Sequence, residues 1–306
     1  INVFSADNIL LENNTLNNAT KSGIMISDEY GSTVNGIIRG NTINNVGDDA
    51  IAVYGNHSKL LIDSNRISGA KGFAGIAISC LQNGQQIRVD NETTGPHDII
   101  VTGNVISGCS GEALYCIGSY KTYITYNTLR DSILEGVCLD SGCIGNYFAH
   151  NEVVNNGIAG GLPGVSIDNG IYNIVDSNNV YNNSCSGIKL VRTGLGNIIV
   201  NNICTDNAYN QMGAKSSGID IEPLAVETEN LGYIDGLGSN WNVVLNNTVT
   251  GSHDFGVFIA DDDTANNGGS SCKNVIMYNK FSSAYTFGAA DFSSMSSTVK
   301  NNITLN

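Results

Sequence analysis

The charged residues that could do chemistry gather in one part of the chain. Asp, Glu, Lys and Arg make up only 14% of the residues. A carboxyl group beside another carboxylate has a raised pKa, so one can hold a proton while the other stays ionised. Such pairs cleave glycosidic bonds by acid–base chemistry. We predict as catalytic residues Asp168, Asp220, Glu222, Lys189 and Arg192, which together with Asp140 form the charged strip.

Two repeated phrases explain why residues so distant in sequence should meet. The phrase Asn-x-apolar returns along the whole chain, from Asn14-Thr-Leu16 to Asn301-Asn-Ile303, mostly at intervals of 22 to 27 residues. A second phrase, Gly/Ala-apolar-x-apolar, begins nine residues after the Asn in six of the repeats. A short period with occasional insertions is typical of a solenoid, in which each repeat forms one coil.

The repeats predict an all-β protein, a parallel β-helix of about ten coils. Each coil holds two or three short strands rich in Val and Ile, and helical periodicity is absent. Equivalent strands stack about 4.8 Å apart, so the repeated asparagines should form a hydrogen-bonded ladder facing inward. No linker divides the chain, which predicts a single domain over 1–306. We expect a fragment lacking an N-terminal cap or attachment region.

These phrases resemble the right-handed parallel β-helix superfamily, which includes pectate lyases, polygalacturonases, alginate epimerases and lyases, and phage tailspikes. The resemblance covers essentially the whole chain and implies a right-handed solenoid that acts on or binds polysaccharide. Gly95-Pro96-His97-Asp98 is similar to the Asp-Pro-His-Glu motif of mannuronan C5-epimerases, with Gly95 in place of the first acid. The segment 218–223, Gly-Ile-Asp-Ile-Glu-Pro, resembles a phrase of bacterial and phage β-helix proteins.

Strand alternation places the charged strip on one outer face, because successive side chains of a strand point to opposite sides. One coil separates Asp140 from Asp168, about 5 Å, and two separate Asp168 from Glu222, about 10 Å. Retaining glycosidases place their carboxyls about 5 to 5.5 Å apart and inverting ones about 6.5 to 9.5 Å, so both geometries are available. Alternatively, Asp140 and Asp168 bind Ca²⁺ while Lys189 or Arg192 abstracts a proton, as in polysaccharide lyases. The alternative without any function is an acidic face that is simply solvated.

Substrate contacts are expected from residues near this face. We predict that flat rings and polar groups contact sugar at Tyr54, Tyr115, His97 and Asp140. Long insertions at 79–98, 222–241 and 260–274 should wall a groove, since loops on a rigid scaffold often carry function. Because the strip is expected to be exposed, changing its charges should scarcely alter stability.

Charge and composition exclude several classes of partner. The net charge of −14 argues against nucleic acid and anionic membranes, whereas a neutral glycan is easily accommodated. No apolar run reaches the length of a membrane span. The eight cysteines are expected to be mainly buried free thiols, with one or two disulfides, Cys138–Cys143 or Cys109–Cys116, as the alternative. We expect a secreted, extracellular or cell-surface protein that forms a possible homo-oligomer.

The sequence therefore predicts an enzyme that cleaves a polysaccharide by hydrolysis or elimination, with either no cofactor or Ca²⁺. A non-catalytic glycan-binding module, such as an adhesin, surface solenoid or tailspike, is the first alternative. A purely structural fibre is the second, because no complete catalytic signature is present.

Overall fold

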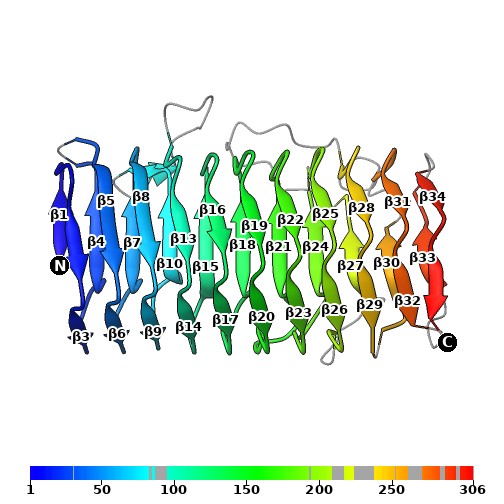
Figure 1. Cartoon of the computed structure of the whole chain (residues 1–306), viewed down its shortest axis with the longest axis horizontal. Helices are drawn as coiled ribbons and strands as arrows, with labels where there is room; N and C mark the ends of the chain where they lie inside the picture. Colours follow the sequence, from blue (N-terminus) through cyan, green and yellow to red (C-terminus); the bar gives the residue numbers. More distant parts are fainter. Residues whose placement is uncertain are drawn as a thin grey trace.

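The repeats fold into a continuous stack of coils. The structure is a computed structural model, and it describes residues 1–29, 31–82, 85–86, 95–192, 194–208, 217–223, 238–251, 253–260, 271–282, 287–293 and 297–305. The coils lie side by side along the long axis, with the N-terminus at one end and the C-terminus at the other (Figure 1). Each of three parallel sheets contains eleven strands, so the prediction of an all-β solenoid of about ten coils is confirmed.

Each coil contributes one strand to each sheet, and we name the sheets A, B and C. Sheet A contains β1 (Asn2–Phe4), β4 (Ile24–Ser27), β7 (Ile51–Tyr54), β10 (Ala74–Ser79), β15 (Glu112–Ile117), β18 (Val137–Asp140), β21 (Val165–Asp168), β24 (Ile188–Val191), β27 (Ser217–Ile221), β30 (Phe255–Ile259) and β33 (Phe287–Asp291). Sheet B contains β2 (Leu10–Glu12), β5 (Val34–Arg39), β8 (Ser58–Asp63), β13 (Ile100–Thr102), β16 (Tyr123–Thr125), β19 (Tyr147–Ala149), β22 (Ile174–Asp176), β25 (Ile198–Val200), β28 (Val243–Leu245), β31 (Val275–Met277) and β34 (Thr298–Lys300). Sheet C contains β3 (Thr15–Asn17), β6 (Thr42–Asn44), β9 (Arg66–Ser68), β14 (Val105–Ser107), β17 (Thr128–Arg130), β20 (Glu152–Val154), β23 (Asn179–Tyr181), β26 (Ile203–Thr205), β29 (Thr248–Thr250), β32 (Lys280–Ser282) and β35 (Ile303–Leu305). A short antiparallel hairpin, β11 (Leu81–Gln82) with β12 (Gln85–Gln86), lies apart from these sheets.

The interior is aliphatic and is lined by asparagine ladders. Most apolar positions of both phrases are buried in one continuous core, although Ile303 in the last coil is exposed. In the predicted ladder, the side-chain amide of Asn127 donates to Asn151 at 3.0 Å, and that of Asn178 donates to Asn202 at 2.9 Å. Each amide also bonds to backbone, as Asn178 does to the carbonyl of Phe148. The inward-facing ladder is therefore confirmed.

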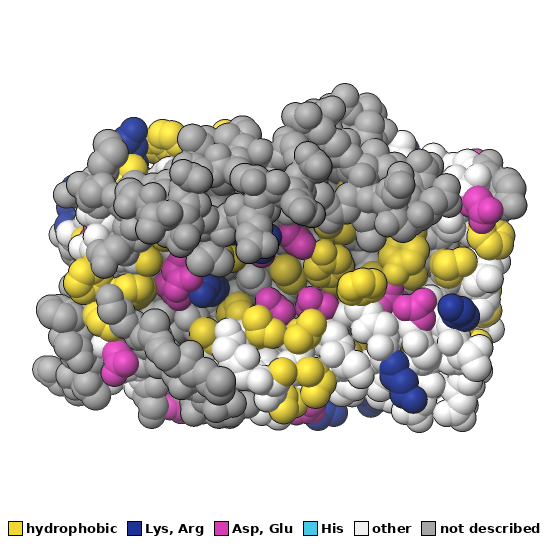
Figure 2. Space-filling model, turned by 180° about the vertical axis from the view of Figure 1, so that it is seen from behind, with side chains coloured by type: hydrophobic (Ala, Val, Ile, Leu, Met, Phe, Trp, Pro, Cys, Tyr) yellow, Lys and Arg dark blue, Asp and Glu magenta, His cyan; other side chains and the backbone are white. Residues whose placement is uncertain are grey.

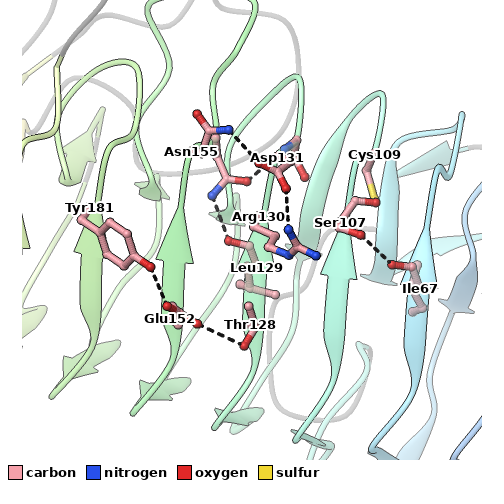
Figure 3. A network of polar contacts seen from close by, with 12 residues as sticks. Ile67, Ser107, Cys109, Thr128, Leu129, Arg130, Asp131, Glu152, Asn155 and Tyr181 are labelled. Atoms are coloured by element: carbon pink, nitrogen blue, oxygen red, sulfur yellow. Dashed lines mark hydrogen bonds and ion pairs between the residues drawn. The ribbon is translucent and has the colours of Figure 1, made fainter.

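Sheet C shows how this solenoid normally uses its outer polar side chains. Tyr181 donates to Glu152 at 2.6 Å, and Thr128 lies 3.5 Å from the other oxygen of the same carboxylate. Arg130 pairs with Asp131 at 3.0 Å (Figure 3). The contacts of Glu152 join neighbouring coils, whereas the Arg130–Asp131 pair lies within one coil. These polar groups therefore satisfy one another.

The cysteines are small apolar residues of the core. All eight are free and seven are buried, with Cys185 half-buried, so the alternative of a disulfide is wrong. In the described part of the chain, no helix is long and apolar enough to cross a membrane.

Candidate active site

The charged strip lies on the outer face of sheet A, because four consecutive strands present equivalent positions there. Lys189 of β24 is paired with Ser166 of β21 on one side and with Asp220 of β27 on the other. Asp140 and Asp168 end β18 and β21, and Asp168 is paired with Val191. Figure 2 shows a face of the solenoid on which acidic and basic side chains lie among hydrophobic ones in a band along the long axis.

One half of the strip is a partly buried ion-pair network around Lys189. The ammonium of Lys189 lies 2.8 Å from Glu222 and 3.8 Å from Asp220. Burial by itself lowers the pKa of Lys189, but the two carboxylates outweigh it and raise that pKa above its usual value. Lys189 is therefore held as a cation.

Asp220 is the most deeply buried acid of this network. Only 5% of its side chain is exposed, the hydroxyl of Ser186 lies 3.4 Å from Oδ2, and Oδ1 is buried with no hydrogen-bond partner. Burial and the neighbouring Glu222 raise the pKa of Asp220 well above its usual value. Lys189 opposes this rise, because its ammonium lies close to Asp220.

The other half of the strip centres on two carboxyls in adjacent coils. Asp140 accepts a hydrogen bond from the hydroxyl of Tyr115 at 2.6 Å and another from the backbone N–H of Ser141 at 2.5 Å. Asp168 pairs with Arg192 at 3.2 Å. Burial, followed by repulsion from Asp140, raises the pKa of Asp168 from its ordinary 3.8 to about 7, and Arg192 only partly opposes this.

Two further acids, Glu112 and Glu135, extend this half and were missed by sequence reasoning. Burial raises the pKa of Glu112 from 4.5 to about 7, and it raises that of Glu135 as well. Both residues directly precede the Gly/Ala of the second phrase, whereas Ser precedes it in the coils of Gly23, Gly187 and Gly218. A comparison of that position across coils is the signal that could have found them.

Not every predicted contact residue joins the site. Tyr54 lies on β7, four coils before Asp168, and its hydroxyl contacts Asp49. His97 forms isolated bridges with Ser58 and Tyr120 at the start of sheet B, and its Nδ1 lies 3.0 Å from the carbonyl of Gly95. The structure therefore gathers Tyr115 and Asp140 with the strip, but places Tyr54 and His97 elsewhere. The predicted groove walls fall largely outside the described residues, since 83–84, 87–94, 224–237 and 261–270 are among those not described.

The charged strip was predicted to be exposed to solvent, and this prediction is wrong. The side chains of Asp168 and Lys189 are each 19% exposed, and that of Glu222 is 24% exposed. These groups pack against one another across coils, which strand alternation alone does not reveal. The strip therefore carries partly desolvated charges, so the premise that it is exposed, on which the expectation of unchanged stability depended, is wrong.

The described residues offer little for a metal ion. No group of three or more His, Cys, Asp or Glu side chains in that part of the chain could hold one. Asp168, one of the two predicted Ca²⁺ ligands, already faces the guanidinium of Arg192.

Comparisons with known proteins agree with this architecture. The family described as "Right handed beta helix region" matches residues 1–94. Comparison with curated protein sequences finds no significant match. Similarity to known proteins is therefore found mainly at the level of the fold.

Several solved structures have a similar fold. The A-module of mannuronan C-5 epimerase AlgE6 from Azotobacter vinelandii superposes with a TM-score of 0.59 at 15% identity, covering 100% of this chain and 88% of that one. An alginate lyase from Paenibacillus sp. gives 0.56 at 12% identity, covering 97% and 95%. Tailspike protein 2 from an Escherichia coli O157:H7 bacteriophage gives 0.57 at 11% identity, covering 90% of this chain and 39% of the tailspike. The chain is a right-handed parallel β-helix, as predicted, and proteins of this fold include ones named for acting on polysaccharide.

Proposed function

We propose that this chain hydrolyses a neutral polysaccharide on the outer face of sheet A, with Asp168 as the general acid. The proposal is based on one observation. Asp168, whose pKa is raised to about 7, lies one coil from Asp140, a carboxylate that accepts two hydrogen bonds. Two carboxyl groups in adjacent positions, one of which holds its proton near neutral pH, form the arrangement that glycosidic cleavage requires.

The reaction proceeds in two balanced steps. Asp168 gives its proton to the glycosidic oxygen while Asp140 attacks the anomeric carbon, so the C–O bond breaks and a glycosyl ester forms. Asp168, now ionised, takes a proton from water, whose oxygen displaces Asp140 and restores both carboxyls. The coil spacing of about 4.8 Å agrees with the carboxyl separation of retaining enzymes, about 5 to 5.5 Å.

The remaining charges position these two acids. Arg192 lies against Asp168, and Tyr115 fixes the carboxylate of Asp140. Asp220 and Glu222 hold Lys189 as an ammonium, which argues against Lys189 as the base of an elimination. Glu222 is engaged by this ion pair at 2.8 Å, and we therefore favour Asp140 over Glu222 as the partner of Asp168.

The charge of the site favours a neutral chain. Six acids lie on this face or interact electrostatically with the residues on it, namely Glu112, Glu135, Asp140, Asp168, Asp220 and Glu222, against the two cations Lys189 and Arg192. Both cations are already paired. A polyuronate would meet repulsion that neither cation is free to offset, although the similar epimerase and lyase are named for alginate.

The test is an activity screen against neutral glycans, alginate and pectin, with reducing ends, unsaturated uronate and the anomeric configuration of the product measured. We expect reducing ends from a neutral glycan, with retained configuration. Asp168→Asn should remove activity, whereas Asp63→Asn, the same change on sheet B, should not. Unsaturated product would show elimination instead, and inversion would transfer the partner role from Asp140 to Glu222.

The competing function is glycan binding without cleavage. It predicts binding of a glycan with no product from any substrate and equal binding by wild type and Asp168→Asn. Specific product formation that is lost in Asp168→Asn excludes it.

A further inference from the structure

Two exposed aromatic residues stand at the corner that leads from sheet A into sheet B. The backbone there stacks coil on coil, as shown by the bridges from Ile144 through Ile171 to Leu195. The residue after each bridge forms the next position of the corner. Tyr172 occupies it in one coil and Trp241 two coils later, with Gly196 in the coil between them.

The glycine gives the tyrosine ring its place. A Cβ at Gly196 would lie 2.7 Å from two carbons of the Tyr172 ring, so that ring lies directly over Gly196 and extends toward the coil of Trp241. On the far side, the ammonium of Lys273 lies 5.0 Å from the centre of the Trp241 ring. Tyr172, Gly196 and Trp241 thus occupy the same corner position in three consecutive coils, and we call this set the aromatic platform.

Neither ring is placed there by folding preferences. Tyr172 and Trp241 are 64% and 53% exposed, so they contribute little to the core. Both have φ of 55°, the left-handed conformation that the same corner position also takes at Lys121, Gly145 and Lys273. The turn is therefore a repeated feature of the coils, and it does not require an aromatic residue.

We propose that the aromatic platform binds a glycan chain by stacking pyranose rings on Tyr172 and Trp241. Flat rings with a polar edge suit a ligand that has both an apolar face and hydroxyl groups. Two coils set the residues about 10 Å apart, which leaves room for successive sugar units rather than for a single one. Lys273 beside Trp241 supplies a donor for hydroxyl oxygens.

The size of the platform distinguishes a glycan from a protein partner. Two rings and a glycine present far less than the roughly 800 Å² per partner that a stable protein interface buries. The net charge of −14 disfavours a nucleic acid, whose bases could otherwise stack on the same rings.

The platform is separate from the acids of sheet A, although both belong to the same coils. Tyr172 follows Asp168 by four residues, and Gly196 follows Arg192 by four, with the corner between them. Binding at the platform needs no bond cleavage, so this inference goes beyond the proposed hydrolysis.

The experiment measures glycan affinity in the Asp168→Asn background, so that cleavage does not interfere. Affinity gel electrophoresis and titration calorimetry would be run against the same panel of glycans. We expect Tyr172→Ala and Trp241→Ala each to weaken binding about three- to tenfold, and the double variant to weaken it further. Gly196→Asn keeps both rings and tolerates the left-handed backbone, yet it displaces the Tyr172 ring and should weaken binding as Tyr172→Ala does.

The matched control is Tyr278→Ala. Tyr278 is 51% exposed with φ of 56°, but it lies at the corner between sheets B and C. Its removal should leave affinity unchanged. The proposal is overturned if no glycan binds, if the platform variants bind as wild type does, or if Tyr278→Ala weakens binding equally. It is also overturned if Trp241→Ala converts an oligomer to monomers, which would show a protein contact. Binding that survives with no cleavage activity in wild type would overturn only the proposed hydrolysis.

Discussion

At the scale of single residues, the protonation of Asp168 decides the pH dependence of activity. Its pKa of about 7 predicts that the proton needed for the leaving group is present below that pH and absent above it. We expect the rate to fall as pH rises through about 7, and Asp168→Asn to lose about 10²- to 10⁴-fold in kcat. A pH–rate profile checks this, with Asp63→Asn as control. A rate that stays constant above neutral pH would assign the acid role to another group.

Lys189 tests whether the strip contributes to stability. Lys189→Met removes the cation that neutralises Glu222 and Asp220 and leaves their charge partly buried, so we expect a loss of about 3 to 5 kcal/mol in unfolding free energy. Urea denaturation measures it. Lys59→Met, on the exposed surface of β8, is the control and should change stability by less than about 0.5 kcal/mol. Similar midpoints for both variants would contradict the burial of this ion pair.

At the scale of elements, the asparagine ladder joins each coil to the next. Asn178→Ala removes the acceptor of both Asn151 N–H donors and a donor to the oxygens of Phe148 and Asn202 in the core, and we expect a cost of about 1 to 3 kcal/mol. Asn179→Ala changes the adjacent exposed asparagine of β23 and should have little effect. Equal destabilisation of the two variants in thermal melts would show that the ladder asparagine contributes no more to stability than an exposed asparagine does. Activity per folded molecule should survive in both.

At the scale of the whole molecule, raised carboxyl pKa values link stability to pH. Asp168 ionises at about 7 when folded and near 3.8 when unfolded, so its stabilising effect is complete below about pH 4 and is lost as pH rises toward 7. Burial acts in the same direction on Asp49, Glu112, Glu135 and Asp220. The buried His57 and His253 act in the opposite direction, because burial lowers their pKa values.

A pairwise measurement isolates the carboxyl contribution from that of the histidines. The stability of wild type relative to Asp168→Asn should rise by an amount on the order of 4 kcal/mol as pH falls from about 7 to about 4. Denaturant unfolding of both proteins across this range gives the difference, in which the histidine contributions cancel. A difference independent of pH would mean that Asp168 is ionised throughout.

Much of the solenoid follows from the spacing of residues along the chain. The nine-residue offset between Asn178 and Gly187 fixes a corner, and strand alternation then puts Lys189 and Asp220 on one outer face. These are local rules that repeat in every coil, so the sequence by itself determined the fold, the ladder and the shared face of the predicted strip residues, although not the addition of Glu112 and Glu135.

The tertiary structure alone decided how these groups meet. Side-chain packing between coils and around corners decides three features of the site. These are the burial of Asp220, the hydrogen bond from Tyr115 to Asp140 and the position of the Tyr172 ring over Gly196. The same packing also places His97 away from the charged strip. A repeat defines which position a residue takes within its coil, but desolvation and contact depend on what fills the neighbouring coils, and no single repeat contains that information.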